Sequence, residues 1–330
     1  MYICVANFLY FGSFYLLIPT LPQYVAHLGG SASHIGLVMG IFTFSSILIR
    51  PYLARLADAH GRRRVLLISS ACFAVLFVPY IRVQTMIPLF AVRIAHGIAH
   101  GAYLAAAFAY IGDLAPIERR GEVIGIFAAS NVLSMALFPG LGIWLLNYSE
   151  GNFSLLFTIS VVAASLSFLA VAMINEMKTA TGKAETMSIL AIVRQRAVWV
   201  SSLALFAGAT VYGAVTSFLP VYAPQRGLKN FGIFFTVYAA STLLSRVLTG
   251  RLSDRVGRSK VVLPFMGLLA VAVFLFPFLH SVAMLILIGT CFGLGFGAYM
   301  PTLNALIVDE TLPKDRGRAI AILPPLWMWG

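Results

Sequence analysis

The stretch ARLADAHGRRR, residues 54–64, carries five charged side chains, although only 10% of the 330 residues in the chain are charged. Apolar runs lie on both sides of it, and a similar stretch, GRLSDRVGRSK, stands between two apolar runs at residues 250–260. The whole chain is 60% hydrophobic, whereas soluble domains are about 45–50% apolar. We therefore expect an all-α membrane protein in which both charged stretches are loops between spanning helices.

The apolar runs predict the number of spans. A helix needs about 20 mostly apolar residues to cross the bilayer, and ten runs satisfy this requirement. The predicted spans are 2–22, 34–53, 65–81, 86–111, 122–146, 153–174, 197–222, 231–250, 261–279 and 282–308. An eleventh apolar run begins near Ala319.

The basic residues indicate how the spans are oriented. Of the 23 lysines and arginines, nineteen lie on the side of the membrane that holds the stretch 54–64. The other side holds only Arg82, Arg226 and Lys229, and Arg93 lies inside a span. Because cytoplasmic loops carry the excess of basic residues, the first side is predicted to be cytoplasmic. The net charge of +12 then follows from the topology, and we expect no nucleic-acid partner.

The two charged stretches belong to an internal repeat with an offset of 196 residues. The offset pairs Asp58 with Asp254, Gly61 with Gly257, and Arg62 with Arg258. It also carries GAY at 101–103 onto GAY at 297–299. Because several matches recur at one spacing along nearly 120 residues, the chain is predicted to consist of two parallel repeats of six spans, an architecture known in transporters.

The repeat defines the predicted domains. Residues 1–174 form the N-terminal bundle, 175–196 the central cytoplasmic loop, and 197–330 the C-terminal bundle. At this offset residue 330 corresponds to residue 134, in the middle of the fifth span. We therefore expect a protein of twelve spans whose eleventh helix is cut short here, and a native form with ten spans is the alternative.

Three motifs resemble those of the major facilitator superfamily. ARLADAHGRRR is similar to the loop signature of that family, and its copy stands at the equivalent place in the second half. RIAHG at 93–97 resembles the fourth-helix signature, and APIERRGEVIG at 115–125 resembles the loop that follows that helix. The resemblance implies a secondary transporter with two parallel six-helix bundles that works by alternating access. It further implies that the loop aspartate latches the two halves together on the cytoplasmic side.

The resemblance thus implies a set of gating residues, namely Asp58, Gly61, Arg62, Asp254, Gly257 and Arg258. The sequence also departs from the family pattern. Ala54 and Ala59 replace a glycine and a basic residue of the loop signature, and His96 replaces the usual glutamine of the fourth helix. The fifth-helix antiporter signature survives only as Pro139 and Gly142. The mode of transport therefore stays open at this point.

Polar residues inside the spans are the candidate substrate- and proton-binding residues. Arg93 is the one permanent charge deep in a span, and His96 and His100 share its helix face. The resemblance implies that helices 1, 4, 7 and 10 line the central cavity, so this face is expected to meet the substrate. Further candidates are Asn7, Tyr10, Asn131, Tyr212, Tyr299 and Asn304. Each of these could equally bridge two helices by a hydrogen bond.

These observations predict a secondary active transporter in the plasma membrane of a bacterium, most simply a monomer that exports a small organic solute in exchange for protons. Uncoupled facilitation, import of a metabolite, and a non-transporting receptor on the same scaffold are the alternatives. The sequence offers no nucleophile–base arrangement and no metal-binding cluster, so we expect neither an enzyme nor a cofactor, only the proton gradient as energy source.

The orientation can be tested with single cysteines at His60 or Val256 in a cysteine-free background. We expect neither to react with a membrane-impermeant thiol reagent added outside intact cells, because both lie on the predicted cytoplasmic side. Both should react after the membrane is permeabilised, which serves as the control. Ready labelling in intact cells would overturn the orientation.

Overall fold

The computed structural model describes residues 1–116, 119–176 and 196–310, and these ranges are helical with short connections and no strands. Ten helical segments in them are long and apolar enough to cross a membrane. They coincide with the ten predicted spans to within a few residues, which confirms the predicted fold class. The eleventh predicted span, near Ala319, lies outside the described residues.

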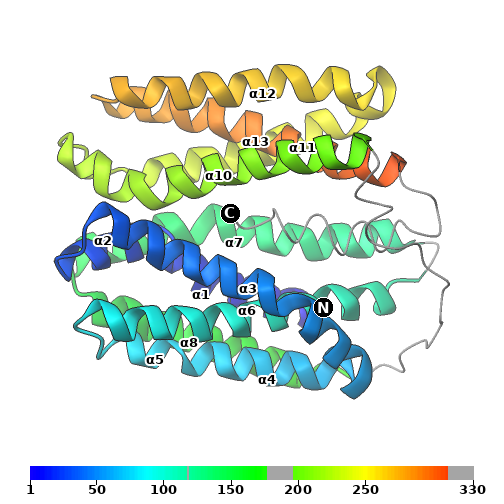
Figure 1. The fold of residues 1–330 in the computed structure, drawn as a ribbon, viewed down its shortest axis with the longest axis horizontal. Helices are drawn as coiled ribbons and strands as arrows, with labels where there is room; N and C mark the ends of the chain where they lie inside the picture. The colour runs from blue at the N-terminus through cyan, green and yellow to red at the C-terminus, as the bar shows by residue number, and fades with distance from the viewer. Residues whose placement is uncertain (117–118, 177–195, 311–330) are drawn as a thin grey trace. The chain divides into compact units, whose positions relative to one another are not determined.

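Some spans are single helices and others are interrupted (Figure 1). The first six spans consist of α1 (Tyr2–Leu17) with α2 (Leu21–His27), α3 (Ala32–His60), α4 (Arg62–Val75) with α5 (Phe77–Tyr80), α6 (Met86–Leu114), α7 (Arg120–Tyr148) and α8 (Phe153–Ala172). The next four consist of α10 (Arg196–Gln225), α11 (Gly232–Val256), α12 (Arg258–Leu275) with the 3-10 turn η2 (Phe276–Phe278), and α13 (Val282–Glu310).

The chain divides into two compact units, Met1–Thr181 and Gly182–Gly330. The division falls inside the segment 175–196 that the sequence assigns to the central loop. In the first unit, α6 packs against α3 and α4, and α1 packs against α7 and α8. In the second unit, α13 packs against α10, α11 and α12. The pairs α3–α6 and α11–α13 are therefore equivalent in the two repeats.

Glycines allow the backbones of α6 and α3 to approach closely. A side chain at Gly97 would collide with the carbonyl oxygen of Phe42. The Cβ of a residue at position 101, where glycine stands, would lie only 2.5 Å from the carbonyl oxygen of Ser46. Small residues at such spacing favour helix packing in membranes, because little hydrophobic driving force exists there.

The second repeat uses the same contacts. A side chain at Gly293 would collide with the carbonyl oxygen of Tyr238, and a Cβ at Gly297 would lie 2.7 Å from the carbonyl oxygen of Thr242. Each of these four residues stands 196 positions after its counterpart in the first repeat. The repeat seen in the sequence is thus a repeat of backbone contacts.

The two charged stretches are not loops, and that prediction was wrong. Helix α3 continues to His60 and α4 begins at Arg62, so that only Gly61 separates them, and only Gly257 separates α11 from α12. The φ angle is 93° at Gly61 and 100° at Gly257, in a region that residues with a side chain rarely adopt. The helices extend this far because alanine, leucine and arginine favour helix and the remaining residues of the stretches tolerate it, until glycine ends each helix.

The close approach predicts which glycines are sensitive to substitution. Gly97→Val should lower the free energy of unfolding by about 1–3 kcal/mol, because overpacking forces α6 away from α3. Gly112→Val, on the same helix, should have a smaller effect because its Cβ would meet nothing within 4 Å. The measurement is unfolding of the purified protein in detergent. Equal losses in the two variants would refute this account of the packing.

Candidate functional site

Arg93 lies on α6 and is only 2% exposed. Its Nε donates a hydrogen bond of 3.0 Å to the carbonyl oxygen of Val38 on α3. Its guanidinium carbon lies 4.0 Å from the centre of the Phe42 ring, and the guanidinium also interacts with the Tyr80 hydroxyl. A carbonyl dipole, a ring face and a hydroxyl therefore surround this charge, as a buried cation requires when no carboxylate among the described residues pairs with it.

His96 and His100 follow Arg93 on the same face of α6 and are 1% and 0% exposed. The Nδ1 of His96 shares a hydrogen bond of 3.2 Å with the Tyr80 hydroxyl. The Nδ1 of His100 shares one of 3.2 Å with the hydroxyl of Tyr10 on α1. The Nε2 of His96 is buried and has no hydrogen-bond partner among the described residues. His96 thus has one ring nitrogen engaged and one available.

Aromatic rings of four other helices of the first unit enclose these residues. The ring centre of Phe73 lies 4.0 Å from that of His96, and Tyr10 stacks on Tyr103 at 3.6 Å. The rings that contact the two histidines are Tyr10, Phe11, Phe14, Phe42, Phe73, Phe77 and Tyr80. The structure thus brings Tyr10, Arg93, His96 and His100 together in the core of the first unit.

Sequence reasoning missed Tyr80, Phe42 and Phe73 as neighbours of this cluster. One signal was present, since Phe73, Phe77 and Tyr80 are spaced to share one helix face. That spacing indicates that the three rings face one way but does not indicate what they meet. No comparable pattern in the sequence distinguishes Phe42 from the other aromatic residues.

The same positions in the second repeat hold different residues. At the offset of 196, Arg93 corresponds to Gly289, His96 to Phe292 and His100 to Phe296. A Cβ at Gly289 would lie 3.2 Å from the carbonyl oxygen of Phe234, the counterpart of Val38. The second unit therefore retains the helix contact and lacks the cation and both titratable rings, so that the charged cluster is particular to the first unit.

Two of the three candidate asparagines, Asn7 and Asn131, lie where α1 packs against α7. The Nδ2 of Asn7 donates hydrogen bonds to the carbonyl oxygen of Phe127 at 3.3 Å and to Ser130 Oγ at 2.8 Å. The hydroxyl of Tyr15 donates to Oδ1 of Asn131 at 3.5 Å. In this structure these side chains bridge the two helices.

Three candidates lie in the second unit. Tyr212 stacks on Phe296 with ring centres 5.0 Å apart, which joins α10 to α13. Tyr299 donates its hydroxyl to the carbonyl oxygen of Ala204. Asn304 is partly exposed on α13, and its Oδ1 is buried without a hydrogen-bond partner in the part of the chain that the structure describes.

The turn at Gly61 is joined to two other helix ends. Arg62 forms an ion pair with Asp113 and donates to the carbonyl oxygen of Ala109, both near the end of α6. Arg63 donates to the carbonyl oxygens of Ala172 and Ile174 at the end of α8, at 2.9 and 2.6 Å. Cations at these positions offset the partial negative charge of helix C-termini. The charged stretch therefore links the ends of α6 and α8 to the turn between α3 and α4.

The structure describes only some of the remaining gating candidates. The side chains of Asp58 and Asp254 are not among the described side chains. Gly257 repeats the turn made by Gly61, and Arg258 follows it at the start of α12 with a partly exposed side chain. Within the described ranges, no group of three histidine, cysteine or acidic residues could hold a metal ion.

Comparisons with known proteins place the chain among transporters. The family model described as Major Facilitator Superfamily matches residues 3–330. The staphylopine export protein of Staphylococcus aureus is 24% identical over 325 residues, covering 94% of this chain and 80% of that protein. The multi-drug resistance efflux pump PmrA homolog of Lactococcus lactis is 25% identical over 323 residues, covering 92% and 78%.

A solved structure of a mutant of the nucleoside transporter NupG has the same fold. It superposes with a TM-score of 0.81, covering 98% of this chain and 86% of that chain at 15% sequence identity. At this identity the likeness concerns the arrangement of helices and not the solute.

The ion pair of Arg62 and Asp113 can be tested by a double-mutant cycle with Arg62→Gln and Asp113→Asn. The side chains are only 17% and 23% exposed, so we expect a coupling free energy of about 1 kcal/mol or more. The exposed pair Arg119–Glu122, at 69% and 52%, is the matched control and should give about 0.3–0.5 kcal/mol. Equal coupling in the two pairs, measured by unfolding in detergent, would show that burial adds nothing.

Proposed function

Because the chain belongs to the Major Facilitator Superfamily, as the match over residues 3–330 establishes, we propose that it exports a small organic solute in exchange for protons by alternating access. Members of this family are multi-pass membrane transporters and not enzymes. Relatives described as export and efflux proteins support the outward direction.

The cluster of Arg93, His96 and His100 carries the proposal of proton coupling. The sequence has no carboxylate deep in any of the ten spans, so a coupled proton needs another carrier. Histidine is the side chain whose charge ordinarily changes near neutral pH. Because the second repeat has glycine and phenylalanines at these positions, the cluster is a local specialisation and not a requirement of the helix packing.

In this proposal His96 takes up the proton. Its Nδ1 is already engaged by the Tyr80 hydroxyl, while its Nε2 has no partner among the described residues. A proton on His96 would place a second positive charge one helical turn from Arg93, in a region of low dielectric constant. Repulsion between the two positive charges would favour a rearrangement of α6. Protonation of His96 would thereby stabilise one conformational state of the transporter over the other.

The membrane potential supplies enough free energy for one proton to bias the conformation of the transporter. One charge crossing the full membrane potential releases about 2.3 kcal/mol per 100 mV. That energy is comparable to the coupling between sites in many allosteric proteins, about 1–3 kcal/mol. A single proton could therefore bias the direction of solute movement.

Uncoupled facilitated transport is the second candidate. The observation that favours it is the enclosure of both histidines, which are 1% and 0% exposed among aromatic rings. In that case Arg93, His96 and His100 would stabilise the first unit and exchange no proton. The pH dependence of transport distinguishes the two functions.

Substitutions in the cluster should change transport in different ways. Arg93→Ala should abolish transport, whereas Arg93→Lys should retain part of it because lysine keeps the charge and loses the planar geometry of the guanidinium. His96→Ala should flatten the pH dependence by removing the titrating group. The measurement is movement of labelled staphylopine and of a fluorescent amphipathic dye in vesicles, from about pH 5.5 to 8.

His280→Ala, at an exposed histidine, is the matched control and should keep the parent pH profile. The thermal stability of each variant separates loss of folding from loss of coupling. If His96→Ala is stable and transports with the parent pH profile, the protein does not use His96 for coupling, and facilitated transport becomes the better description.

A further inference from the structure

The side chain of Tyr80, at the end of α5, contacts both Arg93 and His96 and is 0% exposed. Its hydroxyl shares the hydrogen bond of 3.2 Å with Nδ1 of His96, and the same hydroxyl interacts with the guanidinium of Arg93. Because a guanidinium has N–H donors and no acceptor, the oxygen of Tyr80 is the acceptor in the second contact. One oxygen atom therefore joins the buried cation to the histidine.

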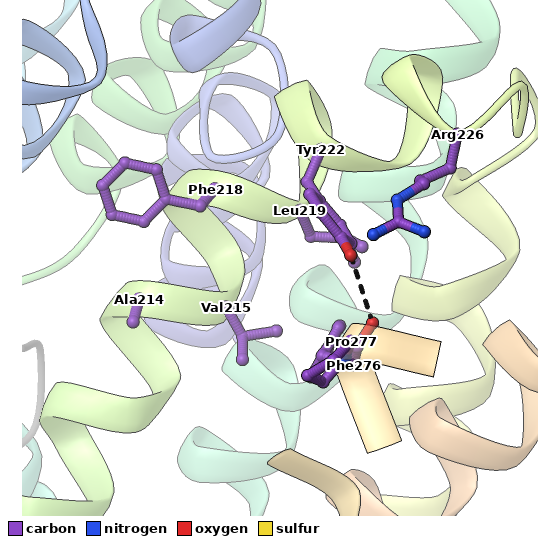
Figure 2. Close-up of a pocket in the computed structure, with 8 residues that line it drawn as sticks. All are labelled: Ala214, Val215, Phe218, Leu219, Tyr222, Arg226, Phe276 and Pro277. Carbon is purple, nitrogen blue, oxygen red and sulfur yellow. Dashed lines mark hydrogen bonds between the residues drawn. The ribbon is translucent and has the colours of Figure 1, made fainter. Parts of the chain in front are cut away.

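The second repeat keeps the position of this tyrosine and lacks its hydroxyl. At the offset of 196, Tyr80 corresponds to Phe276. The hydroxyl of Tyr24 donates to the carbonyl oxygen of Tyr80 at 3.1 Å. The hydroxyl of Tyr222, at the matching place in LPVY, donates to that of Phe276 at 3.4 Å, which Figure 2 shows as a dashed line. Both repeats thus share the backbone contact, whereas the hydroxyl occurs only in the first, beside the cation and the histidines.

Helix packing does not require the hydroxyl of Tyr80. The centre of its ring lies 5.3 Å from that of Phe157 on α8, and a phenylalanine would make the same contact. A buried hydroxyl costs desolvation free energy unless it is hydrogen-bonded. Its two side-chain partners are Arg93 and His96, which the second repeat replaces by glycine and phenylalanine. The hydroxyl therefore belongs with the charged cluster.

Protonation of His96 restricts what this hydroxyl can do. A neutral imidazole has one N–H and one acceptor nitrogen, so its Nδ1 can either accept from the hydroxyl or donate to it. A protonated imidazole donates from both nitrogens, and the hydroxyl can then only accept. The imidazolium and the guanidinium of Arg93 would both donate to the single oxygen of Tyr80. Protonation of His96 would therefore alter the contact between Tyr80 and Arg93.

The charged and titratable groups around His96 come from four helices. They are Arg93 and His100 of α6, Tyr80 of α5, Tyr10 of α1 and Arg50 of α3. Tyr10 shares a hydrogen bond with His100, and Arg50 acts on His100 electrostatically. The rings that α3 and α4 present to His96 are phenylalanines. Among the described residues, Tyr80 is therefore the group of another helix that forms a hydrogen bond with His96.

We propose that Tyr80 is a positioning residue whose hydroxyl transmits the protonation of His96 to Arg93. The inference rests on the proposed function, in which His96 takes up the proton. The proton stays on the imidazole, and its Nδ1–H competes with the guanidinium for the oxygen of Tyr80. Arg93 keeps its contacts with Val38 and Phe42 on α3. Protonation thereby weakens the contact of α6 with α5 and leaves the contact of α6 with α3 in place.

The pH dependence of transport tests the role of the hydroxyl, with the same labelled staphylopine and fluorescent dye in vesicles of the full-length protein. Tyr80→Phe should move the midpoint of the pH profile to lower pH by about one unit, because one hydrogen bond to a charged group changes an equilibrium about tenfold. The protonated ring loses more than the neutral ring, since hydrogen bonds of charged groups are stronger.

Tyr24→Phe is the matched control, because it removes a buried hydroxyl that contacts only the backbone of Tyr80 and Val83. It should lower the thermal stability and keep the parent midpoint. Replacing Tyr80 by 3-fluorotyrosine keeps the ring and the hydroxyl but makes the oxygen a weaker acceptor, so the midpoint should move in the same direction by less. Equal shifts in Tyr80→Phe and Tyr24→Phe would show a purely structural effect and overturn the inference.

A combined variant tests whether Tyr80 acts through His96. In a His96→Ala background, Tyr80→Phe should cause no further change in the pH profile. If Tyr80→Phe keeps the parent midpoint while His96→Ala flattens the profile, the inference is wrong and proton coupling through His96 stands. If His96→Ala itself keeps the parent profile, the proposed coupling and the role of Tyr80 are both wrong.

Discussion

The close contact between the backbones of α6 and α3 determines where Arg93 and its partners on α3 lie. The two helices run in the same direction, so residues four positions apart on one meet residues four positions apart on the other. Gly97 meets the carbonyl oxygen of Phe42, and one turn earlier Arg93 reaches that of Val38. The close approach thus brings the cation within reach of a carbonyl and over a ring face, where its burial is tolerable.

The second repeat shows the same helix packing without the cation and the two histidines. Gly289 continues the row of glycines where the first repeat has Arg93, and phenylalanines replace both histidines. Helix packing alone is therefore satisfied by glycine and aromatic side chains. Burying the cation and the two imidazole rings costs desolvation free energy when the first unit folds. We therefore favour a role in transport over a purely structural role for these residues.

Much of the fold could be predicted from the sequence, because a bilayer imposes length and apolar composition on every span. The internal offset also predicted the equivalence of the two halves, down to Gly61 and Gly257. The side-chain partners of Arg93 could not be predicted in this way. Val38 and Phe42 lie on another span, and helical periodicity describes one helix at a time. The extent of α3 was mispredicted for a related reason, since charge shows where a helix leaves the bilayer and not where it ends.

The single-residue connection between α3 and α4 has a mechanical consequence. Only Gly61 separates α3 from α4, and Arg62 and Arg63 bind the ends of α6 and α8. These connections oppose sliding of α4 along α3, α6 or α8. A displacement of the start of α4 is therefore expected to move the attached ends of α6 and α8 with it. Any compliance in the first unit then resides elsewhere, for example at the breaks between α1 and α2 and between α4 and α5.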